Sequence, residues 1–159
     1  MRRSDREVTS REWIGVVLKE AEWLTIGVCG ENRTPALAPV PFVYAADRFL
    51  VCVIGEDSIY DMLKANPKVC FQAVSRAEVI RHDSLPSKFS MRYKSVTGFG
   101  QAQILRDTQQ AEEARRMVLE RFAPAAAKRE TLSADRTENV IKVEIEEVFG
   151  KSNGYQPEK

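Results

Sequence analysis

Ala38-Pro39-Val40-Pro41-Phe42 lies inside an apolar, strand-like run that covers residues 36–44. Residues two apart in a strand point their N–H groups toward the same edge, so Pro39 and Pro41 remove two donors from one edge. That edge cannot pair normally with another strand, and the strand must border a gap in the sheet. One interpretation is a blunted edge that protects against aggregation. The other is a gap kept open for a flat ligand.

The segments around this run are mostly strands. Strands are predicted at residues 23–28, 36–44, 49–54, 68–80 and 95–106, and alternation of apolar and charged residues over 141–146 predicts a sixth. Strands joined by local turns, without regular strand–helix alternation, favour a closed antiparallel sheet because closure removes exposed edges. The sequence therefore predicts a mainly β (α+β) fold, a six-stranded antiparallel barrel with about three peripheral helices.

Three helices are predicted from capping residues and apolar periodicity. The first follows Thr9-Ser10-Arg11-Glu12 and ends near Glu22, and the second begins at Ser58-Ile59-Tyr60-Asp61 and ends at Asn66-Pro67. The third is capped by Asp107 and Gln110. Its predicted inner face consists of Ala111, Ala114, Val118 and Phe122. We expect one domain over residues 1–150 and a polar tail over 151–159.

The composition of the chain limits its function. Of 159 residues, 43% are apolar and 30% charged, which is typical of a globular domain, and 24 Lys plus Arg nearly cancel 23 Asp plus Glu. The chain therefore has no global field that would attract nucleic acid or an anionic membrane. No apolar run reaches the length of about 20 residues that a membrane span needs, and the start does not resemble a signal peptide. Three cysteines without a CxxC pair favour a reducing compartment, so we expect a cytoplasmic protein.

Two further segments could carry chemistry. In Val96-Thr97-Gly98-Phe99-Gly100-Gln101-Ala102, alternate residues form a small face that suits close approach of a packed helix, a partner subunit or a ligand ring. Met91-Arg92-Tyr93-Lys94-Ser95 combines two cations with a hydroxyl, which suits a phosphate but also an ordinary solvated surface.

Several enzyme classes are disfavoured. His82 is the only histidine and has no Cys or His at metal-ligand spacing, so we expect no metal site and no catalytic triad. Glycine-rich phosphate loops of the GxxxxGK or GxGxxG type are absent. A hydrolase, a kinase or a dinucleotide dehydrogenase is therefore not expected.

Four motifs in order carry a family resemblance. They are Arg2-Arg3-x-Asp5-Arg6-Glu7-Val8-Thr9, Pro39-Val40-Pro41-Phe42-Val43-Tyr44, Asn66-Pro67-Lys68-Val69-Cys70-Phe71 and Met91-Arg92-Tyr93-Lys94-Ser95-Val96-Thr97-Gly98-Phe99-Gly100-Gln101-Ala102. Together they resemble the pyridoxamine 5′-phosphate oxidase-like flavin-nucleotide-binding proteins, in particular the nitroimidazole-resistance branch. The resemblance implies a six-stranded split barrel that forms a homodimer and holds FMN in two grooves at the subunit interface.

The resemblance also implies roles for individual residues. The backbone of Ala38, Pro39, Val40, Pro41 and Phe42 would face the isoalloxazine, Val53 and Ile54 would flank the cofactor, Gly98 would serve close packing, and Lys94 would be a candidate cation for the phosphate. Two positions depart from the family pattern. Glu56 and Asp57-Ser58-Ile59 stand where relatives carry phosphate-binding cations, which leaves Ser58 and a helix N-terminus for the phosphate. Cys52 stands where a histidine is typical.

The functional hypothesis is an FMN-dependent oxidoreductase acting on a small molecule, similar to a nitroreductase or to pyridoxamine-phosphate oxidase. No catalytic residue is assigned, because a thiol with a pKa of about 8.5 cannot replace imidazole acid–base chemistry. Cys52 is interpreted as a small core residue or as a redox-sensitive thiol. The alternative is a degenerate split barrel without flavin that acts as a binding or sensory protein. A third hypothesis keeps the fold and exchanges FMN for haem or a deazaflavin.

Overall fold

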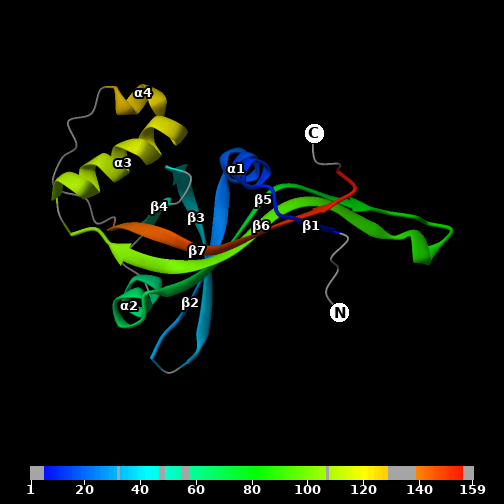
Figure 1. Cartoon of the computed structure of the whole chain (residues 1–159), viewed down its shortest axis with the longest axis horizontal. Helices are drawn as coiled ribbons and strands as arrows, with labels where there is room; N and C mark the ends of the chain where they lie inside the picture. Colours follow the sequence, from blue (N-terminus) through cyan, green and yellow to red (C-terminus); the bar gives the residue numbers. More distant parts are fainter. Residues whose placement is uncertain are drawn as a thin grey trace.

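Six long antiparallel strands form a ring, with helices at its ends and on its flank (Figure 1). The computed structural model describes residues 6–31, 33–46, 49–54, 58–106, 108–128 and 139–155. The strands are β1 (Glu7–Val8), β2 (Trp23–Cys29), β3 (Pro35–Ala45), β4 (Phe49–Ile54), β5 (Lys68–Ile80), β6 (Ser90–Ile104) and β7 (Asn139–Asn153). The helices are α1 (Arg11–Glu20), α2 (Ser58–Ala65), α3 (Thr108–Phe122) and α4 (Pro124–Ala127), with a 3-10 turn at Pro86–Lys88.

The ring follows the order β7-β4-β3-β2-β5-β6 and closes through pairing of β6 with β7. All of these pairings are antiparallel. This confirms the predicted six-stranded antiparallel barrel and its split form. The two-residue strand β1 was not predicted, and it pairs with the outer end of β7, where Glu7 lies opposite Lys151.

The break in the barrel lies between β3 and β4. These strands pair only from Ala45↔Phe49 to Phe42↔Cys52. Residues 35–41 of β3 continue along β2 alone, while Val53 and Ile54 of β4 continue along β7. The two strands therefore separate between Pro41 and Val53, as the prolines predicted, and we call this place the split.

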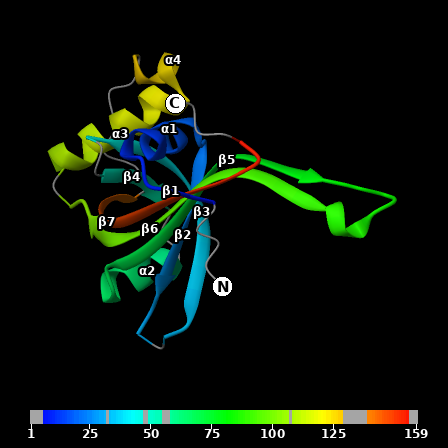
Figure 2. The same cartoon turned by 45° about the vertical axis from the view of Figure 1, so that its right-hand side comes forward.

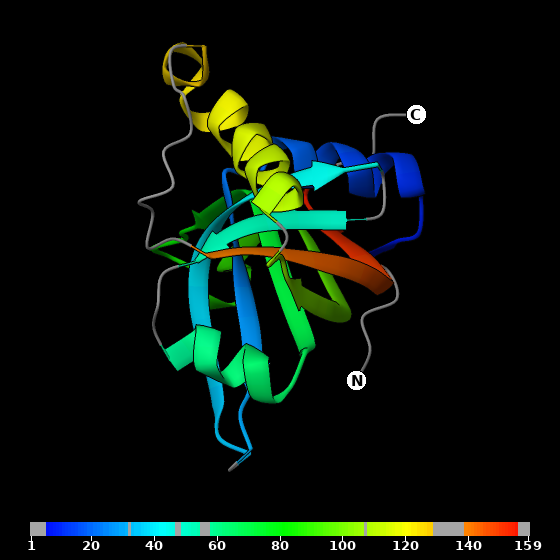
Figure 3. The same cartoon turned by 90° about the vertical axis from the view of Figure 1, so that its left-hand side faces the viewer.

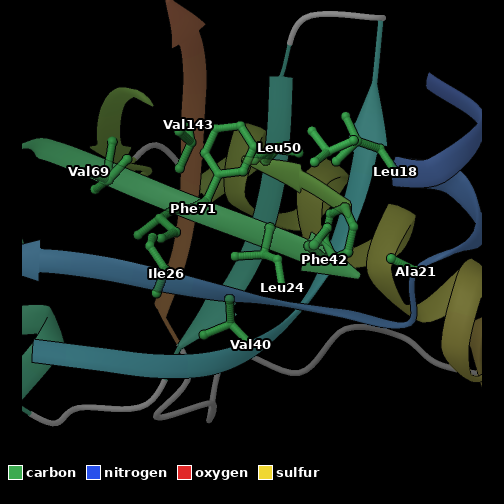
Figure 4. Packing of buried hydrophobic residues seen from close by; sticks show 14 of the residues in the cluster. Leu18, Ala21, Leu24, Ile26, Val40, Phe42, Leu50, Val69, Phe71 and Val143 are labelled. Atoms are coloured by element: carbon green, nitrogen blue, oxygen red, sulfur yellow. The ribbon is translucent and has the colours of Figure 1, made fainter. Parts of the chain in front are cut away.

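The core fills the inside of the ring. Figure 4 shows Leu24, Phe42, Leu50 and Phe71 pointing toward one another from four strands, and each of these side chains is buried. Figures 1 and 3 show α1 and α2 at opposite ends of the barrel. Both helices add their apolar faces to this core: Val17 and Leu18 from α1, and Ile59 and Leu63 from α2.

Helix α3 packs outside the ring. Ala114 and Val118 form a second buried cluster with Val51 of β4 and Val140 of β7, and Ala111 is also buried. The predicted inner face of α3 is confirmed for these alanines and Val118 and is wrong for Phe122, which is 43% exposed. Figure 3 shows the reason, because the C-terminal end of α3 leads away from the strands.

Four boundaries differ from the predicted ones. Ser10, not Thr9, caps α1, since its Oγ accepts from the Trp13 N–H at 3.3 Å. Helix α1 ends at Glu20, because Ala21 already has extended backbone angles. Strand β6 begins at Ser90, so Arg92 and Lys94 are strand residues. Strand β7 continues through residues 151–153, beyond the predicted domain end, because these residues pair with β6.

Strands β5 and β6 extend beyond the ring as a two-stranded arm (Figures 1 and 2). The arm begins at a bulge between Val74 and Arg76. Strand β7 still pairs with β6 at Lys94 and Tyr93, and from Glu78↔Arg92 to Ile80↔Ser90 only β5 and β6 remain, with the 3-10 turn near the tip. None of the described helices is long and apolar enough to cross a lipid bilayer.

Candidate functional site at the split between β3 and β4

The split exposes main-chain groups of β3. Because β2 and β3 pair without interruption from Cys29↔Pro35 to Trp23↔Pro41, the residues that face β2 must be those that keep their N–H groups. The prolines and Leu37 then face the open side. The carbonyls of these residues form a row of acceptors along the open edge. Leu37 also offers an N–H donor, which the prolines lack.

Opposite this row, β4 offers both kinds of group. In an antiparallel ladder alternate residues face the same neighbour, so Val53 points its N–H and C=O toward β3, as Val51 does. The residue across from Val53 would be Pro41, which has no N–H to give. Pro41 can accept from the N–H of Val53 but cannot donate to its carbonyl, so the Val53 carbonyl is left as one more acceptor at the split.

The side chains of the predicted β3 residues point elsewhere. Val40 and Phe42 are buried in the core, and Ala38 packs against it. Pro39 and Pro41 are exposed on the outside of the sheet. Only the backbone of this strand lines the split, and the predicted contact of that backbone with a flavin stays a prediction.

The predicted β4 residues occupy the other side. Cys52 lies opposite Phe42 on β3 and Ile141 on β7, and Val53 and Ile54 follow it along β7. The structure therefore brings the predicted residues of β3 and β4 together across the split. The side chains of residues 52–54 are not described.

Ser58 is the first residue of α2 and is exposed. It follows Ile54 by four residues, so at most about 14 Å separate their Cα atoms. Helix α2 starts near the end of β4, and the positive end of its dipole suits an anion. Glu56 and Asp57, which replace the family's cations, lie outside the described residues.

Lys94 is not brought together with the split in one protomer. It lies on β6, three strand spacings or about 14 Å across the sheet from β3. It is only 8% exposed, and it shares the inward-facing side of β6 with Val96. Arg92 lies on that same side and Ser95 on the opposite one, so the predicted phosphate trio does not converge.

Arg121 of α3 supports the top of the split and was not predicted. Its guanidinium donates to the carbonyl of Phe42 at 2.8 Å, next to the last β3–β4 pair, and to those of Lys19 and Ala21 at 2.9 and 2.5 Å. Burial lowers the pKa of Arg121, an effect that Glu22 opposes. The side chain thus joins β3 to the end of α1, and its partners lie about 80 to 100 residues earlier in the chain.

The small face of β6 has a structural role. A Cβ on Gly98 would lie 2.8 Å from Cε1 of Phe71 and 2.6 Å from the Glu147 carbonyl oxygen. The group that approaches Gly98 is therefore the core ring of Phe71 and the backbone of β7. Of the predicted roles, close packing is confirmed. The close neighbour belongs to the barrel itself, in place of the helix, partner or ligand ring considered from sequence.

The outer face of the sheet carries exposed apolar side chains. In one cross-strand row, Leu37 lies opposite Gly27, Gly27 opposite Cys70, and Cys70 opposite Phe99. Leu37 is 71% exposed, and Cys70 and Phe99 are exposed as well. We define the outer apolar face as Trp23, Leu37, Cys70, Val74 and Phe99. A sheet that is apolar on both faces is unusual for a monomer in water.

One larger groove lies away from the split. It has a volume of about 940 Å³ and runs between α1, the end of β3 and β7, with Gly15, Tyr44 and Val148 among its lining residues. None of the predicted site residues lines it. Within the described part of the chain, no group of three or more His, Cys, Asp or Glu residues could hold a metal ion.

Solved structures share this fold at low identity. A flavocytochrome from Azotobacter vinelandii superposes with a TM-score of 0.82 at 16% identity, over 100% of this chain and 75% of the other. An FAD- and haem-binding protein from Mycobacterium smegmatis gives 0.76 at 19% identity, over 97% and 76%. A Bacteroides thetaiotaomicron protein provisionally assigned to 5-nitroimidazole antibiotic resistance gives 0.73 at 19% identity, over 91% and 85%.

Sequence comparison gives the family. No curated protein matches the chain. The family model described as pyridoxamine 5′-phosphate oxidase matches residues 10–152, which include the whole barrel except β1 and the last residue of β7. On this match, and in agreement with the resemblance of its motifs, the chain belongs to the pyridoxamine 5′-phosphate oxidase family.

Proposed function

We propose that this protein binds FMN along the split and acts as a flavin-dependent oxidoreductase on a small molecule. The observation that carries the proposal is the edge of β3 along the split, where the carbonyls of Leu37 and Pro39 and the N–H of Leu37 lie beyond the last β3–β4 pair of the described residues. Membership of the family, and structural neighbours described as flavin-binding, support the choice of a flavin as the ligand.

The groups at the split fit the parts of FMN. The edge of an isoalloxazine ring has one N–H donor and several acceptors, which match the carbonyl row of β3 and the N–H of Leu37. The Ser58 hydroxyl and the N-terminal dipole of α2 are candidates for the phosphate. Bound FMN would supply one- and two-electron transfer, and the protein would supply the slot and the orientation.

The proposal includes a homodimer that covers the outer apolar face. Trp23 and Leu37 are 57% and 71% exposed in the single chain. They lie on β2 and β3, so a second copy that buries them would also cover the outer side of the split. This arrangement would exclude water from the flavin slot and would place residues of the partner near the cofactor.

The first test is the binding of FMN. The purified protein should absorb between about 350 and 500 nm, or should take up FMN added at tens of micromolar concentration. A protein that stays colourless and does not bind added FMN contradicts the proposal, and it favours the alternative of a flavin-free binding or sensory barrel.

Charge at the start of α2 provides a sharper test. Ser58→Arg adds a cation at an exposed position and should tighten FMN binding about tenfold or more if the phosphate lies there. Ala65→Arg adds the same charge at the exposed other end of the helix and serves as the control. Equal effects of the two variants would place the phosphate elsewhere.

Oxidoreductase activity needs its own measurement. Bound FMN reduced with dithionite under anaerobic conditions should be reoxidised by a nitroaromatic compound or another small electron acceptor. Absorbance near 450 nm reports the reaction. Reduced protein that is reoxidised by none of these acceptors would leave a flavin-binding protein without this activity.

A further inference from the structure

Hydrogen-bond donors without acceptors gather at the base of the arm. Three buried polar atoms have no partner there: Nε of Arg6, Nε1 of Trp13 and Oγ of Ser75. Lys94 is 92% buried at the same place, and no hydrogen bond or ion pair of its side chain occurs among the described residues. Buried polar groups normally find partners, so such a group of orphans needs an explanation.

The sheet register places these residues together. Lys94 lies between Arg76 on β5 and Ser152 on β7, and Ser75 is the extra residue of the bulge that precedes Arg76. In Figure 1, α1, β1, β6 and β7 meet at this point, where the arm leaves the barrel.

The remaining two residues approach from α1 and from the N-terminal segment. The Trp13 ring lies against Gly150, which pairs with Val96 two residues beyond Lys94. Arg6 directly precedes Glu7, which pairs with Lys151 beside Ser152. Because Lys94 and Val96 share the inward side of β6, Trp13 and Lys94 lie on the same side of the sheet.

The chemistry of the group points to an anion. The Arg6, Trp13 and Lys94 groups can only donate, and Ser75 can donate as well as accept. Arg6 and Lys94 also carry a positive charge, which attracts an anion. The nearby carboxylate of Glu78 is engaged by Arg92 at 3.9 Å. A tetrahedral oxyanion would accept from several donors at once and would neutralise the charge.

We propose that Arg6, Trp13, Ser75 and Lys94 form a binding site for a phosphate group, separate from the split. The phosphate is either a free anion or the phosphate end of a larger ligand. The site rests on these residues alone and does not depend on the function proposed for the split.

Lys94→Met tests the site. In phosphate-free buffer this variant should stay folded and melt close to the wild-type temperature, because an apolar side chain of similar length replaces one that has no ion pair among the described residues. Inorganic phosphate at ten times its dissociation constant should raise the melting temperature of the wild type by about 3–5 °C. It should leave Lys94→Met unchanged.

Two further variants provide a second test of the site and a control. Arg6→Gln keeps polar N–H groups without the charge and should weaken phosphate binding about tenfold in a titration. Lys88→Met removes an exposed cation from the turn near the arm tip and should bind phosphate like the wild type. Equal phosphate responses of the wild type, Lys94→Met and Lys88→Met would overturn the site.

A comparison of FMN with riboflavin identifies the source of the phosphate. If Lys94→Met weakens binding of FMN but not of riboflavin, the site holds the phosphate end of the flavin. If it abolishes the response to inorganic phosphate and leaves both flavins unaffected, the site holds a free anion. A melting temperature of the wild type that does not respond to phosphate contradicts the proposal whether or not FMN binds.

Discussion

Gly98 shows how a single residue controls the width of the barrel. Its missing side chain leaves room for the ring of Phe71 on β5 and for the backbone of β7 at Glu147. Phe71 is itself buried in the centre of the core. The glycine therefore sets how closely β5, β6 and β7 approach.

Gly98→Ala is expected to destabilise the protein by at least about 2 kcal/mol, because the backbone oxygen 2.6 Å from the new methyl group cannot easily move. Gly15→Ala is the matched control. Its new methyl group would lie 3.6 Å from Tyr44 in the middle of α1, and alanine should stabilise that helix by about 0.5–1 kcal/mol. Urea unfolding of both variants checks the opposite signs.

At the scale of elements, the side chain of Arg121 connects α3 with α1 and β3. Arg121 of α3 donates to carbonyls at the C-terminal end of α1 and to Phe42 of β3. The last carbonyls of a helix lack partners within the helix and carry its negative dipole end, so a guanidinium stabilises them doubly. The same contact fixes β3 where the split begins.

Arg121→Ala should lower the free energy of unfolding by about 2–3 kcal/mol, since it removes the guanidinium donor from the part-buried carbonyls of Phe42 and Ala21 and from the exposed carbonyl of Lys19. Arg116→Ala, on an exposed position of the same helix, should change it by less than about 0.5 kcal/mol. Thermal and urea unfolding measure both. Similar small effects in the two variants would mean that solvent replaces the guanidinium without cost.

The sequence predicted most elements because their local signals are strong. Strands Phe49–Ile54 and Lys68–Ile80 match the predicted ranges, since turn and helix signals bound them on both sides. The start of β6 was missed because Arg92 and Lys94 suggest a surface loop, and strand β1 is too short to produce a pattern. The split was predictable from two prolines. The hydrogen bonds of Arg121 to α1 and β3 were not predictable, because its partners are far away in the sequence.

At the scale of the whole molecule, the outer apolar face and the arm form one continuous surface. Val79 and Met91 pair on the arm and are 43% and 42% exposed, and they lie on the same side of the sheet as Val74. An isolated two-stranded ribbon is marginally stable in water, so the arm also needs a partner surface. Both features favour the homodimer proposed above.

Leu37→Asp should convert this dimer into monomers of 18.0 kDa without lowering the stability of the fold, because Leu37 is 71% exposed in the single chain. Light scattering after size-exclusion chromatography measures the mass. Val16→Asp, on an exposed position of α1, is the control and should remain dimeric. A wild-type protein that is already monomeric at tens of micromolar concentration contradicts the homodimer.

The position of β7 in the ring has a consequence for synthesis. This strand pairs with β1, β4 and β6. These three earlier strands cannot complete their hydrogen bonds until β7 is available. During translation the ring stays open until residues 139–153 have left the ribosome. The nascent protein therefore completes its barrel only after β7 has emerged, and until then the unpaired edges of β4 and β6 need shielding by the ribosome surface or a chaperone.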